Sequence, residues 1–374
     1  MGRPLVSIIL PCFNARPFLD ERIDSILRQT FSDWEAIVLD SYSTDGSWEF
    51  FTSIGSTDSR FRLYQIPREG VYAALNRGIE LAAGEFLHVA TCDDTMLPEF
   101  LATLLEAFAI CPEAGIAASD VSLINRHGGQ LTREYMADHL AAESIDDMLA
   151  LDLVRSYPIK RNLNYRPPPH DCLLHFSAKS VYFSLTQLLI RTTVARSIEP
   201  FETMVGSIAD LGWLVRLTNL AGTVHVPRKL TMWCFHGNQL SACQDSSHLV
   251  SLRAMFERAM PQICRRHQRL LTRNECATLM LPVKAYLATS RKAQRRLKLE
   301  ACIRVLWMFF RKPPATLRAI HRTQFSIQTL KGTLVPMFFA RLGLAPEDID
   351  ADTAHRAVRS EAGLPSGALP EAKH

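Results

Sequence analysis

Two apolar stretches, Trp-Glu-Ala-Ile-Val-Leu-Asp at residues 34–40 and Phe-Leu-His-Val-Ala-Thr-Cys-Asp-Asp at residues 86–94, both end in acidic side chains. Short apolar runs of this kind are typical of buried strands. The carboxyl ends of parallel strands meet at one end of an open α/β sheet, where ligands bind. We therefore expect Asp40, Asp93 and Asp94 to lie near one crevice, which would suit a metal-bound diphosphate and a nucleoside.

The sequence around these two stretches alternates between strand and helix patterns. Strands are predicted at residues 6–10, 34–40, 61–66, 86–91 and 115–119, and helices at residues 18–29, from about 48, 71–82 and 98–110. Such alternation implies right-handed crossovers and a mainly parallel sheet. The predicted fold class is therefore α/β.

The composition is that of an ordinary globular protein, with 374 residues, 47% hydrophobic residues and a formal net charge of +4. Such a chain is too apolar to be disordered, and its charge gives no reason to expect a nucleic-acid partner. The nine cysteines form no Cys-x-x-Cys pair, which argues against a zinc knuckle and indicates reduced thiols. There is no signal-peptide pattern and no apolar run long enough to span a membrane, so we expect a cytoplasmic protein.

Several short segments in the first half of the chain, taken in order, carry a family resemblance. They are residues 11–14, 25–29, 35, 40–47, 70–79, 83–86 and 92–94. Together they resemble family 2 inverting glycosyltransferases, and the later pieces are especially similar to bacterial exopolysaccharide-type members. The resemblance covers about residues 4–125 and resumes over about 185–241. It implies a GT-A nucleotide-sugar-binding fold, a nucleotide-diphospho-sugar donor with UDP-sugar as the expected form, and a divalent metal, Mn²⁺ or Mg²⁺.

The same resemblance implies a set of nucleotide-binding residues, namely Pro11, Asn14, Asp40 and Thr91. A carboxylate at a strand end, such as that of Asp40, accepts hydrogen bonds from an imino N–H or a sugar hydroxyl, although capping of the following turn is the alternative. Ser41 stands where the family often has a second Asp, and Tyr42 replaces the usual Gly, which puts the base selectivity in doubt. We interpret Asp45 as a turn and cap residue.

Three residues form the predicted metal site: Asp93, Asp94 and His236. Carboxylate oxygens hold a hard divalent cation, which offsets the charge on a leaving diphosphate. The family motif is Asp-x-Asp, and here Thr91 occupies its first position, so Asp93 matches the metal-binding position. Asp94 has the alternative role of stabilising the turn or positioning Asp93, and a purely structural role is the alternative for His236.

Asp210 is the predicted general base, at the start of a Trp/Leu/Arg-containing helix that resembles the family's acidic motif. Single displacement at an anomeric carbon needs one carboxylate to accept the proton of the acceptor hydroxyl. Ala209 replaces the Glu that usually precedes this position. A helix N-cap is the alternative role for Asp210.

The pattern becomes helical after about residue 246. We therefore predict a GT-A domain over residues 1–245, with a donor half at about 1–125 and an acceptor half at about 126–245, a helical region over 246–345 and a disordered tail over 346–374. Residues 291–312 combine basic side chains with an aromatic cluster. This segment suits an anionic membrane surface and a saccharide or lipid-linked saccharide acceptor at the inner face of the cytoplasmic membrane. A helix packed on the catalytic domain is the alternative.

The predicted activity is inverting transfer of a sugar to a hydroxyl acceptor in surface polysaccharide or glycolipid synthesis. A nucleotidyltransferase would also gather carboxylates at a sheet end, but it would normally need a Gly-rich phosphate loop after the first strand, where this chain has Pro-Cys-Phe-Asn at residues 11–14. An inactive nucleotide-sugar-binding or scaffold protein is the other alternative, and the departures at Ser41, Thr91 and Ala209 leave it open.

Overall fold

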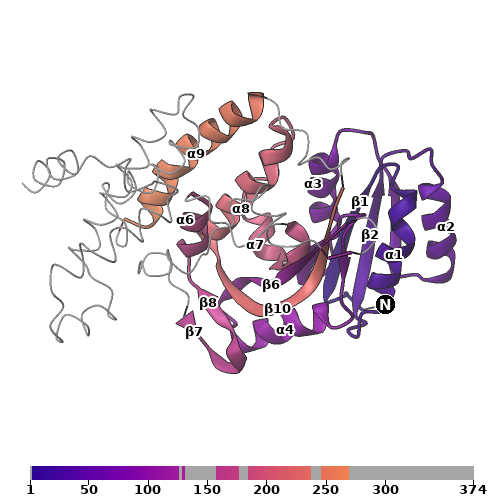
Figure 1. Cartoon of the computed structure of the whole chain (residues 1–374), viewed down its shortest axis with the longest axis horizontal. Coiled ribbons are helices and arrows are strands. Elements are labelled where there is room, and N and C mark those ends of the chain that lie inside the picture. Colours follow the sequence, from indigo (N-terminus) through magenta and orange to yellow (C-terminus); the bar gives the residue numbers. More distant parts are fainter. Residues whose placement is uncertain (1, 126–128, 131–156, 177–183, 237–245, 269–374) are drawn as a thin grey trace, which may run out of the picture. The chain divides into compact units, whose positions relative to one another are not determined.

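The computed structural model describes residues 2–125, 129–130, 157–176, 184–236 and 246–268, all of which lie in the unit Met1–Leu270 (Figure 1). The strands are β1 (Val6–Cys12), β2 (Trp34–Asp40), β3 (Phe61–Gln65), β4 (Phe86–Val89), β5 (Thr95–Met96), β6 (Ala114–Asn125), β7 (Tyr157–Pro158), β8 (Asn164–Arg166), β9 (Leu188–Arg191) and β10 (Gly222–Phe235). The helices are α1 (Arg16–Leu27), α2 (Ser47–Thr57), α3 (Val71–Leu81), α4 (Phe100–Ile110), α6 (His170–Phe176), α7 (Thr192–Arg196), α8 (Ala209–Leu220) and α9 (Ser246–Arg266).

One sheet organises the described residues, with the strand order β3-β2-β1-β4-β9-β6-β10-β8-β7 and β5 paired to β10. Strands β3, β2, β1 and β4 are mutually parallel, and β6 runs parallel to β10. The short strand β9 is antiparallel to both β4 and β6, so it joins the two parallel blocks. The predicted α/β class with a mainly parallel central sheet is confirmed.

Helices cover both faces of this sheet, and two apolar clusters fill the two interfaces. On one face, side chains of α1, α2 and α4 pack against alternate residues of β1 and β2 such as Ile8 and Val38. On the other face, α3, α7 and α8 pack against the intervening residues, including Ile9 and Leu39. At Gly78 an added Cβ would lie 2.2 Å from the Ile9 side chain, so α3 approaches the sheet as closely as it does because that residue is glycine.

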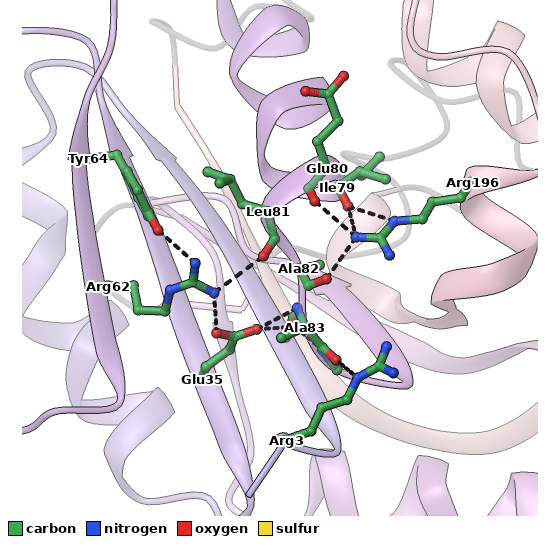
Figure 2. Close-up of polar contacts among 12 residues, drawn as sticks. Arg3, Glu35, Arg62, Tyr64, Ile79, Glu80, Leu81, Ala82, Ala83 and Arg196 are labelled. Atoms are coloured by element: carbon green, nitrogen blue, oxygen red, sulfur yellow. Dashed lines mark hydrogen bonds and ion pairs between the residues drawn. The ribbon is translucent and has the colours of Figure 1, made fainter. Parts of the chain in front are cut away.

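At the amino end of the parallel strands, a fully paired polar network joins the sheet to α3. The buried carboxylate of Glu35 in β2 accepts hydrogen bonds from the Ser7 hydroxyl at 2.6 Å, the Arg62 guanidinium at 2.6 Å and the Ala83 N–H at 2.8 Å. Figure 2 shows Glu35 between Arg62 and Ala83. In the same view Arg196 of α7 donates to the carbonyl oxygens that end α3, among them Ile79 and Ala82. These contacts stabilise the fold and leave no carboxylate oxygen of Glu35 available for a ligand.

The structure departs from the sequence predictions in three places, two at strand ends and one at a cysteine. The ladder of β4 ends at Val89 rather than at Thr91, because the chain turns into the short strand β5, which pairs with β10. Strand β6 continues to Asn125 because β10 pairs with it along nearly its whole length. Five described cysteines are free thiols, but Cys264 is disulfide-bonded, so the prediction of reduced thiols is wrong at that residue.

Helix α9 is the part of the predicted helical C-terminal region that falls within the described residues. The basic segment 291–312 and the predicted disordered tail 346–374 lie outside them. Among the described helices, none combines the length and the hydropathy needed to cross a membrane.

Candidate functional site

Asp40 is the last residue of β2 and lies at the carboxyl end of the parallel strands, directly opposite Cys12 of β1. Its side chain is fully buried. One carboxylate oxygen, Oδ2, accepts the Ser43 N–H at 3.0 Å, which closes the turn after the strand. The other oxygen, Oδ1, is buried and has no hydrogen-bond partner among the described residues. An unsatisfied buried carboxylate oxygen is costly, and it is the kind of atom that a ligand donor satisfies.

Asn14 ties together the two loops that follow β1 and β2. Its N–H donates to the Ser43 hydroxyl at 2.9 Å, and its side-chain oxygen accepts the Thr44 N–H at 2.8 Å. Asp45 accepts the Arg16 N–H at 2.9 Å and the Ser47 hydroxyl at 2.6 Å, so it acts as the turn and cap residue that the sequence indicated. These contacts fix the shape of the loops beside Asp40.

Asp93 and His236 come together from distant parts of the chain. Asp93 follows β4, His236 follows β10, and the His236 Nε2 atom lies 3.0 Å from Asp93 Oδ2. Both side chains are only partly exposed, at 24% for Asp93 and 13% for His236. The imidazole also stacks on Phe18 of α1, with ring centroids 5.1 Å apart. A carboxylate oxygen and an imidazole nitrogen therefore converge at the end of β4.

Asp94 points into the protein instead. Its Oδ1 atom accepts the Cys234 N–H at 3.0 Å, and its Oδ2 atom accepts the Ser184 hydroxyl at 3.2 Å. Burial, followed by the charge of Asp93, raises the pKa of Asp94 to about 7, although the hydrogen bonds from Cys234 and from Thr91 act in the opposite direction. The carboxylate of Asp94 thus anchors the turn that presents Asp93.

A buried arginine supports the same turn and was not among the sequence-based candidates. Arg22 of α1 donates to the Asp94 carbonyl oxygen at 3.1 Å, and another of its nitrogens lies 3.4 Å from His88 Nε2. Burial lowers the pKa of His88 to about 3, so the ring is neutral and its Nδ1–H donates to the Leu188 carbonyl at 2.9 Å. The available signal was periodicity, because Arg22 shares the apolar face of its helix with Leu19 and Ile23.

Two thiols were also missed. Cys12 ends β1 and Cys92 follows β4, and the Cys92 thiol donates to the Pro11 carbonyl oxygen at 3.2 Å. Interaction with Cys92, which outweighs burial, lowers the pKa of Cys12, whereas the pKa of Cys92 is raised well above its ordinary value by the interaction with Cys12 and by burial. Neither position has a sequence signal, because the two residues are far apart in the chain and become neighbours only through the sheet.

Asp210 lies in the first turn of α8, and its Oδ1 atom accepts the Leu211 N–H at 2.6 Å. Burial raises the pKa of Asp210 to about 6. Tyr72 of α3 is a titratable neighbour of Asp210, and its pKa is raised by burial and then by the charge of Asp210. Tyr72 stacks on Phe201, which in turn stacks on Trp213 of α8, so α3 and α8 are joined beside the carboxylate.

The donor atoms present fit a hard divalent cation that is shared with a substrate. No group of three His, Cys, Asp or Glu side chains within the described part of the chain is placed to hold a metal ion. Mg²⁺ commonly takes one or two carboxylates together with substrate phosphate oxygens and waters. The Asp93 carboxylate supplies such a ligand, and the His236 nitrogen lies beside it, while Asp94 has both oxygens engaged.

Comparison with known proteins finds similarity in the first part of the chain. Residues 7–157 match the model of the family described as glycosyl transferase family 2. Over 91 residues, 24% of this chain and 26% of its own length, the uncharacterized glycosyltransferase EpsJ of Bacillus subtilis (strain 168) is 41% identical. The putative teichuronic acid biosynthesis glycosyltransferase TuaG of the same strain is 30% identical over 132 residues, 35% of this chain and 52% of its own length. The chain thus spans about a quarter to a half of these curated relatives.

Among solved structures, S. aureus TarS has a TM-score of 0.53 and 13% sequence identity, over 96% of this chain and 55% of that chain. Residues 1–349 of TarS in complex with UDP-GlcNAc give a TM-score of 0.51 at 12% identity, over 97% of this chain and 93% of that chain. At these identities the similarity concerns the fold alone, and it agrees with the GT-A arrangement that the sequence predicted.

Proposed function

We propose that this chain, whose residues 7–157 match the glycosyl transferase family 2 model, transfers a sugar from a UDP-sugar to a hydroxyl acceptor, with inversion. The observation that carries the proposal is the buried, unpartnered Oδ1 atom of Asp40, at the same end of the parallel strands as Asp93. TarS, which shares the fold, is described in complex with UDP and with UDP-GlcNAc.

Asp40 would accept the imino N–H of the uracil base through Oδ1. The bond would be charge-assisted and would form in a dry site, where such bonds are strong. Since Oδ1 is inaccessible to solvent, neighbouring side chains must move aside to admit the base, as is common when ligands bind. Asn14 shapes the adjoining loops, and Pro11 and Thr91 lie at the ends of β1 and β4, where the ribose and diphosphate would run.

Asp93 and His236 would hold a divalent metal, Mn²⁺ or Mg²⁺. When bound, that ion would offset the negative charge that develops on the leaving diphosphate. Other residues of the chain would orient the Asp93 carboxylate. Asp94, held by Ser184 and Cys234, and Arg22, bonded to the turn itself, keep the Asp93 carboxylate at the end of β4.

Asp210 would act as the general base. Its pKa of about 6 leaves it mostly ionised at neutral pH and still basic enough to take a proton from an acceptor hydroxyl as that oxygen attacks the anomeric carbon. A single in-line displacement of this kind inverts the configuration. The Leu211 N–H and the packing of α8 on α3 orient the carboxylate.

We extend the proposal to the acceptor and to its location. The product would be a surface polysaccharide or a glycolipid, and the name of TuaG, a putative teichuronic acid biosynthesis glycosyltransferase, supports the first of these. Residues 1–245 would perform the transfer, and the basic segment 291–312 would bring them to the inner face of the cytoplasmic membrane. Salt-sensitive co-sedimentation with anionic vesicles, but not with neutral ones, would support this location, and equal recovery in the supernatant in all conditions would contradict it.

Turnover of the donor separates an enzyme from an inactive sugar-binding protein. Binding to the native state raises the melting temperature by mass action, so UDP-GlcNAc with Mn²⁺ should raise it more than either alone. The same sample should release free UDP over time. Stabilisation without UDP release would support the inactive binder, and stabilisation by nucleoside triphosphates instead of nucleotide-sugars would favour a nucleotidyltransferase.

A further inference from the structure

The parallel pairing of β1 with β4 brings two cysteines near each other at the carboxyl end of the sheet. The register runs from Val6 opposite Phe86 to Ile9 opposite Val89. It continues beyond the ladder, because the Ala90 N–H donates to the Ile9 carbonyl at 2.8 Å. Cys12 and Cys92 each lie three residues beyond the last pair, and the Cys92 thiol donates to the Pro11 carbonyl at 3.2 Å.

The two thiols are neighbours and both are free. The Cys92 sulfur lies 3.2 Å from the carbonyl oxygen of Pro11, the residue before Cys12, each thiol shifts the pKa of the other, and neither belongs to a disulfide. Neighbouring strands lie about 4.7–4.9 Å apart. A disulfide needs Cα atoms about 4.4–6.8 Å apart, so the spacing of the two strands is within the range that an S–S bond spans. Cys92 is half-buried and is the more accessible of the two, since Cys12 is only 3% exposed.

We propose that Cys12 and Cys92 form a redox-sensitive dithiol that closes to a disulfide under peroxide and thereby weakens donor binding. The second half of this statement rests on the proposed glycosyltransferase function, whereas the first half does not.

The chemistry needs a two-electron oxidant, and hydrogen peroxide is small enough to reach a half-buried thiol. The sulfur of one of the two cysteines attacks one peroxide oxygen, the O–O bond breaks, and that cysteine becomes a sulfenic acid as one water leaves. The sulfur of the other cysteine then attacks the sulfenic acid sulfur, the S–O bond breaks, and the departing hydroxide takes the proton of the second thiol to give a second water. Two thiols lose two electrons, and one peroxide gains them.

Closing the bond would disturb the donor site at both ends. The sulfur atoms must approach to about 2.05 Å, and Cys92 loses the proton that it donates to Pro11. Cys12 lies opposite Asp40 in the register and contacts the Ser43 hydroxyl at 4.0 Å, while Cys92 immediately precedes Asp93. Displacement of Asp40 would cost the base its hydrogen bond to a charged group, so we expect the affinity for UDP to fall about tenfold or more.

The test uses the full-length chain, first reduced and then treated with hydrogen peroxide. Digestion without reductant followed by mass spectrometry should reveal a linked pair of peptides containing Cys12 and Cys92, which disappears with dithiothreitol. UDP titration with Mn²⁺ then gives the ratio of oxidised to reduced dissociation constants for each protein. Cys12→Ser and Cys92→Ser should keep a ratio near one. Cys111→Ala, which removes a buried free thiol elsewhere, should retain the wild-type ratio.

The possible outcomes separate the two halves of the proposal. A linked peptide with a ratio of ten or more in the wild type and in Cys111→Ala, but not in the two serine variants, supports it. Absence of the linked peptide overturns the dithiol. A linked peptide with an unchanged ratio overturns the effect on donor binding. If the reduced wild type does not bind UDP at all, the proposed function fails, while the linked peptide still decides whether the dithiol forms.

Discussion

Strand β2 carries one buried carboxylate near each end, and the two have opposite surroundings. Glu35, near the amino end, receives hydrogen bonds from Ser7, Arg62 and Ala83 (Figure 2). Burial acts to raise the pKa of Glu35, but these three hydrogen bonds and the charge of Arg62 together lower it. Asp40, at the carboxyl end, receives one hydrogen bond from Ser43 and keeps Oδ1 unpartnered within the described structure. The folded chain supplies hydrogen bonds to both carboxylate oxygens of Glu35, but among the described residues it supplies none to Oδ1 of Asp40.

The same contrast holds across the two ends of the sheet. At the amino end, guanidinium groups meet carboxylates and helix-ending carbonyls, which is the arrangement expected of structural polar groups. At the carboxyl end lie the Asp93 carboxylate paired with the His236 imidazole, the neighbouring thiols of Cys12 and Cys92, and Asp94, whose pKa is raised. Incomplete or perturbed polar groups gathered at one place indicate a functional site.

The largest expected effect is at Asp93. Asp93→Ala should reduce sugar transfer about 10,000-fold or below detection, because the carboxylate that we propose as a metal ligand is lost. Asp94→Ala is the matched comparison. It should reduce transfer less per folded molecule but lower the melting temperature more, because it strips Ser184 and the Cys234 N–H of their partner. Full Mn²⁺-dependent transfer by folded Asp93→Ala protein would remove Asp93 from the site.

Asp210→Asn should come next, with transfer lowered about 100- to 10,000-fold by loss of the general base. The affinity for UDP should stay within about twofold, since the base acts on the acceptor. Stability should rise, because the neutral amide avoids the burial penalty that raises the Asp210 pKa. That gain should be larger at pH 8 than at pH 5, where the wild-type carboxyl is mostly protonated. Simultaneous loss of UDP binding and transfer would instead make Asp210 a donor-binding or structural residue.

Glu35→Ala tests the paired end of β2. It should lower the free energy of unfolding at pH 7 by about 2–4 kcal/mol, because Arg62 and the buried Ser7 lose their partner. The lowered pKa of Glu35 means that its stabilising contribution is present above the pKa of the unfolded chain and is lost as the pH falls through the native value. Denaturant titration measures the change. A loss below about 0.5 kcal/mol would show that this network contributes little.

The pH dependence of transfer should show an acid limb near pH 6. The base must be unprotonated, so below the Asp210 pKa of about 6 the rate should fall about tenfold per pH unit. The residual activity of Asp210→Asn should lack this limb. An identical limb in the variant would assign the titration to another group.

Much of the parallel sheet was predictable because each strand and helix there is a local pattern. Strand β2 and the apolar face of α3 were placed from residues adjacent in sequence, and Asp40 and Asp93 followed from where the strands end. The antiparallel strands β8 and β9 were not predicted, since strands of three or four residues leave little periodicity.

The internal arrangement of the site depended on contacts that no local pattern encodes. The pairing of Asp93 with His236 joins residues 143 positions apart, and the family resemblance, rather than spacing, suggested it. The same spacing argument gave Asp93 and Asp94 similar roles, although the hydrogen bond from Cys234 turns Asp94 inward. The proximity of Cys12 to Cys92 and the burial of Arg22 follow from strand pairing and helix docking, which the sequence does not state locally.

The measurement that tests the central claim most directly is calorimetric titration of UDP, with Mn²⁺ present, into the wild type, Asp40→Asn and Glu35→Gln. In Asp40→Asn the amide oxygen can still accept the Ser43 N–H, but its NH₂ group would face the imino N–H of the base. A lost hydrogen bond to a charged group costs about 1.5–3 kcal/mol, so UDP affinity should fall about 10- to 150-fold. Glu35→Gln, at the other end of the same strand, should bind UDP like the wild type. Equal affinity in all three proteins, or a loss confined to Glu35→Gln, would contradict the placement of the donor site at Asp40.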